Sequence, residues 1–324
     1  MLRAAHAWGL LALLIVAALA VLVSVLVGSV ELPWSASIQA LFGAGDDLTR
    51  TVVTQVRLPR ALSAVAVGSL LGLAGVLLQA LFRNPLADPF VLGISGGAAV
   101  GALSGMLLGL GWSGLHFTAA AGALLIALTT FSLGRGGGVL RLLLTGVVLA
   151  STCGAITSLM LALADNVQLR GMVFWLAGDL GWAEQPALLL ALAAAATVAA
   201  FLYGRVLNVL ASGELRSASL GLPGNGARLT VFAVAAALTG MAVLSAGPVG
   251  FVGLVAPHLV RLAFGTSDHR VVAPAAALCG AALVCCADVL SRSIAPPRQL
   301  PVGAVMAMIG APLFLWLLRK SART

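Results

Sequence analysis

The succession of apolar runs that fills this chain almost from end to end limits its fold more than any other feature. A helix needs about 17–25 apolar residues to cross a bilayer. Nine runs have about this length and a tenth is shorter; they lie at 8–30, 61–82, 90–110, 115–133, 139–164, 186–203, 229–246, 249–264, 271–290 and 300–318. Only 9% of the 324 residues are charged, against about 25% in a soluble domain. The sequence therefore predicts an all-α integral membrane protein with about ten transmembrane helices in a single domain, 1–324.

The first run could instead be a secretory signal, because Arg3 and His6 precede the apolar segment from Trp8 to Val27. That segment is about 20 residues long, whereas the apolar part of a signal has about 7–15 residues. We therefore expect it to be the first transmembrane helix.

The stretch 83–109 combines a polar turn with a stripe of glycines. The glycines recur at every fourth residue, at Gly93, Gly97, Gly101, Gly105 and Gly109. On a helix they share one face, and in a bilayer such a face lets a second helix approach closely. The residues between them are apolar, which disfavours a flexible loop. The stretch predicts a rigid turn and a closely packed helix, with packing or gating roles for Asn84, Pro85, Asp88, Pro89, Gly93, Gly97 and Gly101.

Basic residues predict the orientation of the chain, because cytoplasmic loops carry an excess of them. An even number of helices places both termini on the same side. If that side is the cytoplasm, the inner segments hold twelve of the 18 Lys and Arg residues and the outer segments hold six. We therefore expect both termini in the cytoplasm.

Three loops are long enough to contain structure of their own. The segments 31–60 and 165–186 are predicted outside, and the second is expected to hold a short helix with Trp175 and Trp182 at the membrane interface. The longest cytoplasmic loop, 204–228, contains an amphipathic segment, 213–223. From its residues alone, this segment fits a solvated connector and a short helix that docks on a cytoplasmic partner equally well.

The chain lacks the residues that several kinds of function require. A P-loop requires a lysine that reaches the phosphates of the nucleotide, but the only lysine is Lys320, near the C-terminus. The basic residues occur singly, so nucleic acid is not an expected partner despite the net charge of +8. The histidines are far apart in the sequence, at His6, His116, His258 and His269. The cysteines lie in apolar runs and are interpreted as buried thiols; they are Cys153, Cys279, Cys285 and Cys286. No metal or cofactor is therefore expected.

Ion-coupled carriers keep charged groups near the middle of the membrane, and the apolar runs of this chain hold almost none. Asp288 is the exception, and an ion pair with Arg292, four residues later, is favoured over a proton relay. A secondary carrier is therefore the weaker alternative, and we expect another subunit to supply the energy for uphill transport.

Four arginines are predicted at the outer surface, against the usual excess on the inner side: Arg57, Arg60, Arg292 and Arg298. Single arginines at the interface are usually lipid anchors. Four together favour docking of an acidic surface.

Motifs over nearly the whole chain are similar to those of one family. They are Arg57-Leu58-Pro59-Arg60, Gln79 to Pro89, Leu92 to Ala98, Gly213-Glu214 to Gly221, Ala246 to Arg261, Asp268-His269-Arg270, Leu300 to Gly303 and Gly310-Ala311-Pro312. Together they closely resemble the FecCD-type permeases, the membrane subunits of ABC importers for ferric siderophores, haem and vitamin B12.

The resemblance implies ten helices per subunit and a homodimer with the translocation pathway between its two copies. It also implies two cytoplasmic P-loop ATPase subunits, which hold ATP and magnesium, and a periplasmic substrate-binding protein. Coupling to the ATPases falls in the loop 204–228, at Glu214, Arg216, Ser217, Ala218, Leu220 and Gly221.

Further residues follow from the same resemblance. Arg57, Arg60 and Arg292 match arginines that face acidic residues of the binding protein, whereas Arg298 has no such counterpart. The fifth helix lines the pathway in this family, so the pathway candidates, by analogy, are Ser151, Thr152, Thr157, Ser158 and Met160.

The resemblance implies a non-enzymatic permease of the inner membrane that moves cargo by alternating access, driven by ATP hydrolysis on its partner. Iron complexes are the commoner cargo in the family, so haem or a ferric siderophore is expected. Vitamin B12 is the alternative, since no residue discriminates between these cargoes.

Overall fold

The computed structural model describes residues 4–134, 138–182, 185–220 and 224–321, and within these ranges every regular element is a helix. The helices are α1 (Ala4–Leu26), α2 (Trp34–Leu41), α3 (Asp47–Thr51), α4 (Leu58–Phe82), α5 (Ile94–Leu107), α6 (Trp112–Gly134), α7 (Gly138–Leu163), α8 (Asn166–Ala177), α9 (Pro186–Leu202), α10 (Gly204–Ala211), α11 (Glu214–Ser219), α12 (Gly224–Ala246), α13 (Val252–Phe264), α14 (His269–Ser293) and α15 (Val302–Ser321). A π-helical segment, Val52–Arg57, leads into α4, and 3₁₀ segments lie at Pro89–Leu92 and Leu180–Trp182.

Six of the described helices are long and apolar enough to cross a membrane, and the pair α9 and α10, bent by 61°, makes a seventh. Three shorter apolar helices lie at Ile94–Leu107, Val252–Phe264 and Val302–Leu317. Each of the ten predicted runs coincides with one of these helices, but three of them are too short to span by length alone. The all-α membrane fold is confirmed, and the count of ten spans stays a prediction.

Helix α4 lies at the centre of the packing, with 89% of its apolar window buried. Glycines bring its backbone against its neighbours: a Cβ at Gly68 would overlap the carbonyl of Gly280 in α14, and a Cβ at Gly75 would overlap that of Gly253 in α13. Because no side chain separates these backbones, α4, α13 and α14 form a dense core.

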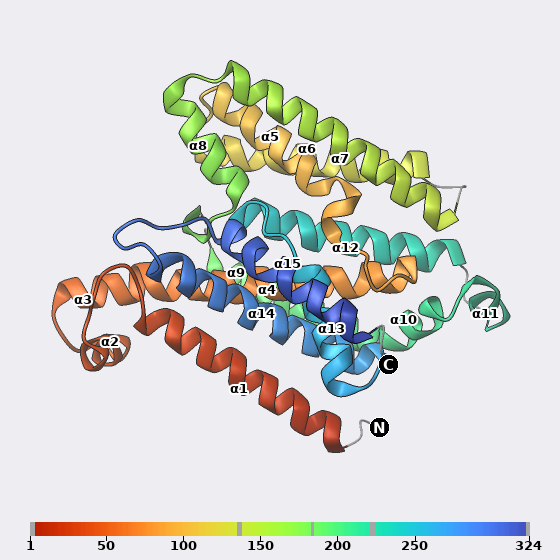
Figure 1. The fold of residues 1–324 in the computed structure, drawn as a ribbon, viewed down its shortest axis with the longest axis horizontal. Coiled ribbons are helices and arrows are strands. Elements are labelled where there is room, and N and C mark those ends of the chain that lie inside the picture. The colour runs from red at the N-terminus through yellow and green to blue at the C-terminus, as the bar shows by residue number, and fades with distance from the viewer. Residues whose placement is uncertain (1–3, 135–137, 183–184, 221–223, 322–324) are drawn as a thin grey trace.

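Helices α5, α6 and α7 form a second layer, which lies above α4 and α12 in Figure 1. A Cβ at Gly97 would overlap the carbonyl of Gly122 in α6, and one at Gly101 would overlap that of Thr118. Close packing of the glycine stripe is thus confirmed within α5. The expectation of one continuous helix was wrong, because Gly93 and Gly109 have left-handed φ angles of +75° and +63° and lie outside α5.

The start of α1 and the end of α15 lie at the same end of the molecule, beside α10 and α11, whereas α2 and α3 lie at the opposite end (Figure 1). This arrangement agrees with the expectation that both termini share one side. The assignment of that side to the cytoplasm stays a prediction, and on its basis the end with α2 and α3 is called the outer end below.

Candidate functional site

Arg60, near the start of α4, joins three segments that are remote in sequence. Its guanidinium donates to Asp288 Oδ1 in α14 at 2.7 Å, to Asp179 Oδ1 at 2.9 Å and to Gln299 Oε1 at 3.0 Å. Asp179 follows α8, and Gln299 lies between α14 and α15. A single buried arginine therefore ties two loops of the outer end to the central helix.

Asp288 is fully buried and faces a second cation, Arg292, whose guanidinium lies 2.7 Å from Asp288 Oδ2. The ion pair four residues apart, expected from the sequence, is confirmed. Arg292 also donates to Ser24 O and Ser24 Oγ at 3.1 and 2.9 Å, and to Val27 O at 3.0 Å. One carboxylate thus balances two buried guanidinium groups, as a charge in a low-dielectric interior requires.

Arg57 completes this cluster at the end of α1. Its guanidinium donates to Val25 O at 3.2 Å, Leu26 O at 2.8 Å and Val30 O at 2.5 Å. The last carbonyls of a helix have no partner in the helix, and the helix dipole favours a cation there. Arg57 and Arg292 together therefore cap the C-terminus of α1.

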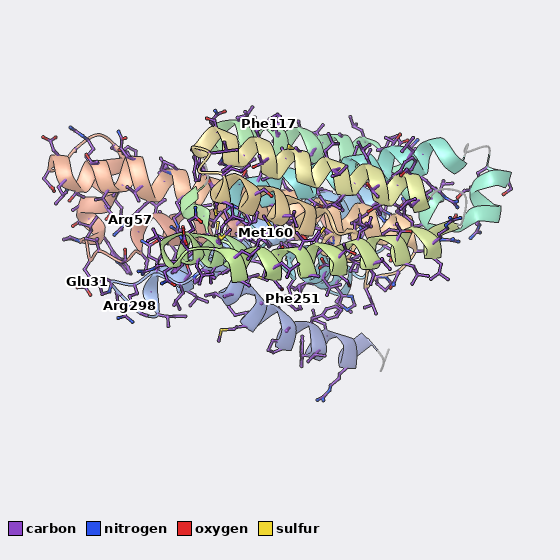
Figure 2. The ribbon with its side chains drawn as sticks, turned by 90° about the horizontal axis from the view of Figure 1, so that it is seen from above. Glu31, Arg57, Phe117, Met160, Phe251 and Arg298 are labelled. Carbon is purple, nitrogen blue, oxygen red and sulfur yellow. The ribbon has the colours of Figure 1, made fainter. Side chains whose placement is uncertain are left out.

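The structure places the four predicted docking arginines differently from one another. The expectation of exposed side chains was wrong for Arg57, Arg60 and Arg292, which are 3%, 9% and 3% exposed, because they are bound to carbonyls and carboxylates of their own chain. Arg298 is exposed, and it lies near Arg57 and Glu31 at one end of the molecule in Figure 2. Docking of a partner on these residues stays a prediction.

The polar turn between α4 and α5 is held by hydrogen bonds of its own side chains, and the rigidity expected from its two prolines stays a prediction. Asn84 Oδ1 accepts a hydrogen bond from Leu86 N at 2.9 Å, and Asp88 accepts one from Phe90 N at 2.7 Å. Burial raises the pKa of Asp88 to about 6, although the Phe90 N–H group acts in the opposite direction. Pro89 follows at the first position of the 3₁₀ segment, where its missing N–H is not needed.

Gln79, near the end of α4, connects this turn to α13, a role that sequence reasoning missed. Its amide donates to Ala87 O in the turn at 3.4 Å and to Gly253 O at 3.2 Å. Arg261 of α13 donates to Gln79 Oε1. A long polar residue amid buried apolar neighbours was the available signal, because such a group must find internal partners.

The amphipathic segment of the loop 204–228 contains the short helix α11. The structure therefore agrees with a short helix there, and docking of that helix on a partner stays a prediction. Ser217 is buried, and its hydroxyl donates to Val209 O at 2.8 Å and Gly213 O at 2.7 Å. Arg216 is exposed, and Leu220 is 62% exposed. The side chains of Glu214 and Ala218, and all of Gly221, lie outside the described residues.

Helix α10 fastens this short helix to the start of α14. Asn208 donates to Asp268 Oδ1 at 2.8 Å, and its own Oδ1 accepts from His269 N at 2.9 Å. Arg270 pairs with Asp268 at 3.0 Å. Burial raises the pKa of Asp268, but the hydrogen bonds from Arg270 and Asn208 outweigh it and hold that pKa at about 2. Hydrogen bonds thus connect α11, through α10, to the start of α14.

The five pathway candidates lie on α7, of which only 11% of the apolar window is buried. Ser151, Thr152 and Ser158 are exposed, whereas Thr157 and Met160 are half-buried. The three exposed hydroxyls donate to the carbonyl four residues earlier in α7, at 2.9–3.0 Å. This face is thus accessible and its polar groups are satisfied within the helix.

Two smaller expectations were wrong. Trp175 is only 1% exposed and belongs to the core, because α8 turns its side chain inward rather than toward the membrane interface; the side chain of Trp182 is not described. Cys286 is exposed, because it lies on the outer face of α14, whereas Cys153, Cys279 and Cys285 are buried. In the described residues, no group of three or more His, Cys, Asp or Glu side chains is arranged to hold a metal.

Comparisons with known proteins agree with this geometry. The model of the FecCD transport family matches residues 13–320. The vitamin B12 import system permease proteins BtuC of Shigella sonnei (strain Ss046) and Escherichia coli (strain SE11) are 41% identical to this chain over 282 residues, or 84% of each chain.

Solved structures give the same result at the level of the fold. A metal-chelate type ABC transporter, in an inward-facing conformation, has a TM-score of 0.85 and 29% identity over 96% of this chain and 98% of its own. PsaBC from Streptococcus pneumoniae, at 17% identity and a TM-score of 0.58 over 83% of this chain and 93% of its own, shares the fold alone.

Proposed function

This chain belongs to the FecCD transport family and is the multi-pass inner-membrane permease of an ABC importer, and we propose that it carries vitamin B12 through a pathway between two copies of itself. It is a transport subunit, and ATP hydrolysis lies with a separate ATPase.

The cargo proposal rests on one observation, the 41% identity over 84% of both chains to vitamin B12 permeases. The iron complex expected from the sequence is the second candidate. It is favoured by the likeness to a metal-chelate type transporter at 29% identity, a description that fits an iron chelate as well as a cobalt corrinoid. The hydroxyls of α7 are satisfied within the helix, so we infer that the pathway holds its cargo loosely and that the binding protein supplies specificity.

The homodimer is supported by the exposure of α7. A helix with so little burial is either in contact with lipid or covered by another chain, and Ser151, Thr152 and Ser158 are polar for a lipid face. In a dimer that covers α7, these residues, Thr157 and Met160 would line the pathway between the copies.

The coupling proposal follows the contacts at the other end of the molecule. ATPase subunits that close on ATP would push on α11 at the exposed Arg216 and Leu220. The displacement would pass through Asn208 and Asp268 to α14, and from there to α4 by the glycine contacts. Rigid helices that meet through backbone can shift together in this way.

At the outer end, we propose that an acidic substrate-binding protein docks over Arg298 and the arginine cluster. Arg60 and Arg292 pair with two carboxylates, Asp179 and Asp288, whereas Arg57 binds backbone carbonyls, which leaves one positive charge in excess beneath that surface. The buried arginines then act by shaping the docking surface and by their field rather than as exposed contacts.

The decisive experiment is uptake in proteoliposomes that contain this chain, its ATPase and external binding protein. Uptake of radiolabelled cyanocobalamin that needs ATP, and that stops when the P-loop lysine of the ATPase is replaced, would support the proposal. Uptake of a ferric siderophore or haem alone under the same conditions would replace the cargo. Uptake that ignores ATP and follows an ion gradient would overturn the importer mechanism.

A further inference from the structure

Two hollows adjoin one another along α6 and α12, and α9 also lines the second of them. The first has a volume of about 330 Å³, and all 15 residues that line it are apolar. The second, of about 400 Å³, is lined in part by polar groups, among them Ser113, His116, Gln185 and Ser245, together with Trp112. Met241 and Leu244 line both hollows, so the two adjoin, and together they are called the α6–α12 groove.

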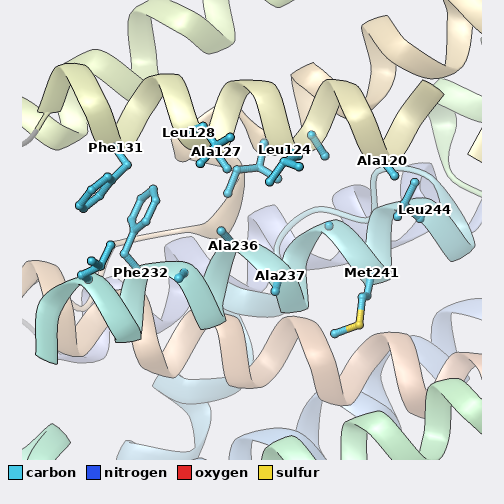
Figure 3. Close-up of a pocket in the computed structure, with 15 residues that line it drawn as sticks. Ala120, Leu124, Ala127, Leu128, Phe131, Phe232, Ala236, Ala237, Met241 and Leu244 are labelled. Carbon is cyan, nitrogen blue, oxygen red and sulfur yellow. The ribbon is translucent and has the colours of Figure 1, made fainter. Parts of the chain in front are cut away.

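Two phenylalanines lie near one end of the apolar part of this groove. Figure 3 shows Phe131 and Phe232 facing one another there, with Met241 and Leu244 at the opposite end. The centroids of the two phenyl rings are 5.7 Å apart. Between these ends the groove is lined largely by alanines, which leave room between two helices that would otherwise touch.

Gly240 shows that the protein itself does not fill this room. A Cβ built on Gly240 would meet no atom within 4 Å. The glycines of the core behave in the opposite way, since a Cβ at Gly97 or Gly101 would overlap the backbone of α6. Close packing of helices therefore explains Gly97 and Gly101, whereas Gly240 borders space that something outside this chain can occupy.

The groove is long enough and apolar enough to accommodate an acyl chain. Its apolar part extends along α12 from Leu229 to Leu244, roughly 22 Å at 1.5 Å per residue, which exceeds the about 15 Å of one leaflet of the hydrocarbon core. Both hollows fall in the size range of ligand sites. In that environment the available apolar molecules of this length are the lipids of the bilayer.

The mouth of the groove has the chemistry of a headgroup region. Trp112, a residue type that is enriched where hydrocarbon meets water, lies there beside His116. His116 Nδ1 lies 2.9 Å from Trp112 O, and because a carbonyl only accepts, Nδ1 carries the proton. The other ring nitrogen of His116, with the amide of Gln185 and the hydroxyls of Ser113 and Ser245, offers polar partners for a lipid headgroup.

We propose that the α6–α12 groove binds one phospholipid, with an acyl chain between the two helices and its headgroup at Trp112, His116 and Gln185. Helix α6 belongs to the layer of α5, α6 and α7, and α12 packs on α4. The lipid fills the seam between this layer and the core. The site does not depend on the identity of the cargo.

The test is native mass spectrometry of the full chain in mild detergent with added palmitoyl-oleoyl phosphatidylethanolamine. The wild-type chain should retain one lipid, and Gly240→Phe, which places a ring in the groove, should lower that occupancy at least tenfold. The matched control is Ala121→Phe on the exposed face of α6, which should retain the lipid. Equal retention by Gly240→Phe and the wild type would overturn the proposal.

A measurement on the unaltered protein tests the site even if Gly240→Phe does not fold. A phosphatidylethanolamine with a diazirine in its acyl chain should, after illumination, label peptides of α6 and α12. Labelling spread over α1, α7 and α15 without enrichment in α6 and α12 would show that lipid contacts this chain only non-specifically, and it would overturn the proposal.

Discussion

Replacing Asp288 by asparagine removes the one carboxylate that two buried guanidinium groups share. Asn keeps the volume and a carbonyl oxygen, so the packing of α14 against α4 is retained while the negative charge is lost. Arg60 still has Asp179 at 2.9 Å, but Arg292 is left with carbonyl and hydroxyl partners only. Breaking one buried ion pair costs about 3–5 kcal/mol. Because other partners remain, we expect a loss of about 3 kcal/mol, which lowers the ratio of folded to unfolded protein roughly 100-fold.

The assay is reversible unfolding of the purified chain in mixed micelles with increasing SDS, compared with the wild type. Asp47→Asn is the matched control, because the pair Asp47–Arg50 at the same end of the molecule is exposed, with relative side-chain exposures of 90% and 47%. Solvent screens such a pair, so this variant should unfold with the wild type.

A second variant tests the cause of the loss. Replacing Arg60, Asp288 and Arg292 together by methionine, leucine and methionine removes every charge that Asp288 balances, and replacing a buried ion network by apolar side chains is often close to neutral. This triple variant should be more stable than Asp288→Asn. Stability of Asp288→Asn within 0.5 kcal/mol of the wild type, a threshold of about the scatter of surface substitutions, would refute the reasoning.

Three further predictions concern the core, the coupling helix and the turn. Gly68→Leu should lower the melting temperature in detergent strongly, because its side chain would overlap the Gly280 carbonyl, whereas Gly154→Ala, whose Cβ meets no atom within 4 Å, should melt with the wild type; equal effects would contradict the packing of α4. Leu220→Asp should reduce ATP-dependent uptake at least tenfold while the chain still folds and copurifies with its partner, and unchanged uptake would exclude α11 from coupling. Asp88 has a pKa of about 6 in the folded chain, above the 3.8 of the free group, so the folded state binds the extra proton and stability should fall as pH rises from about 4 to 6. Asp88→Asn should flatten that fall in melting temperature, and an identical pH profile would show that Asp88 does not titrate there.

Local features of this fold could be predicted from the sequence. The apolar runs give the helices because a bilayer offers a backbone no other partners. Asp288 and Arg292 lie four residues apart, so their pairing follows from the helix repeat alone. The turn at Asn84 to Pro89 was equally accessible, since its hydrogen bonds join residues two positions apart.

Long-range features could not be predicted in this way. The carbonyls that bind Arg57 are 27–32 residues away in sequence, and carbonyls are present at every position, so nothing in the sequence marks them as partners. Arg60 reaches Asp179 and Gln299 across 119 and 239 residues. The glycines of α4, at Gly68, Gly72 and Gly75, do not recur at one constant spacing. Gly68 and Gly72 face different residues of α14, and Gly75 faces α13. A search of the sequence for one repeating glycine stripe therefore does not find them.

The contacts of α4 also bear on how the chain is made. Ser69 donates to Ala277 O, 208 residues later, and Arg60 pairs with Asp288, 228 residues later. At synthesis rates of about 5–20 residues per second, α4 waits about 10–40 s for the helix that satisfies Ser69. During that interval the hydroxyl of Ser69 has no Ala277 carbonyl to bind, and Arg60 has Asp179 but not yet Asp288, so a chain that ends before α14 exposes glycine backbone and an incompletely paired arginine in its second long membrane helix.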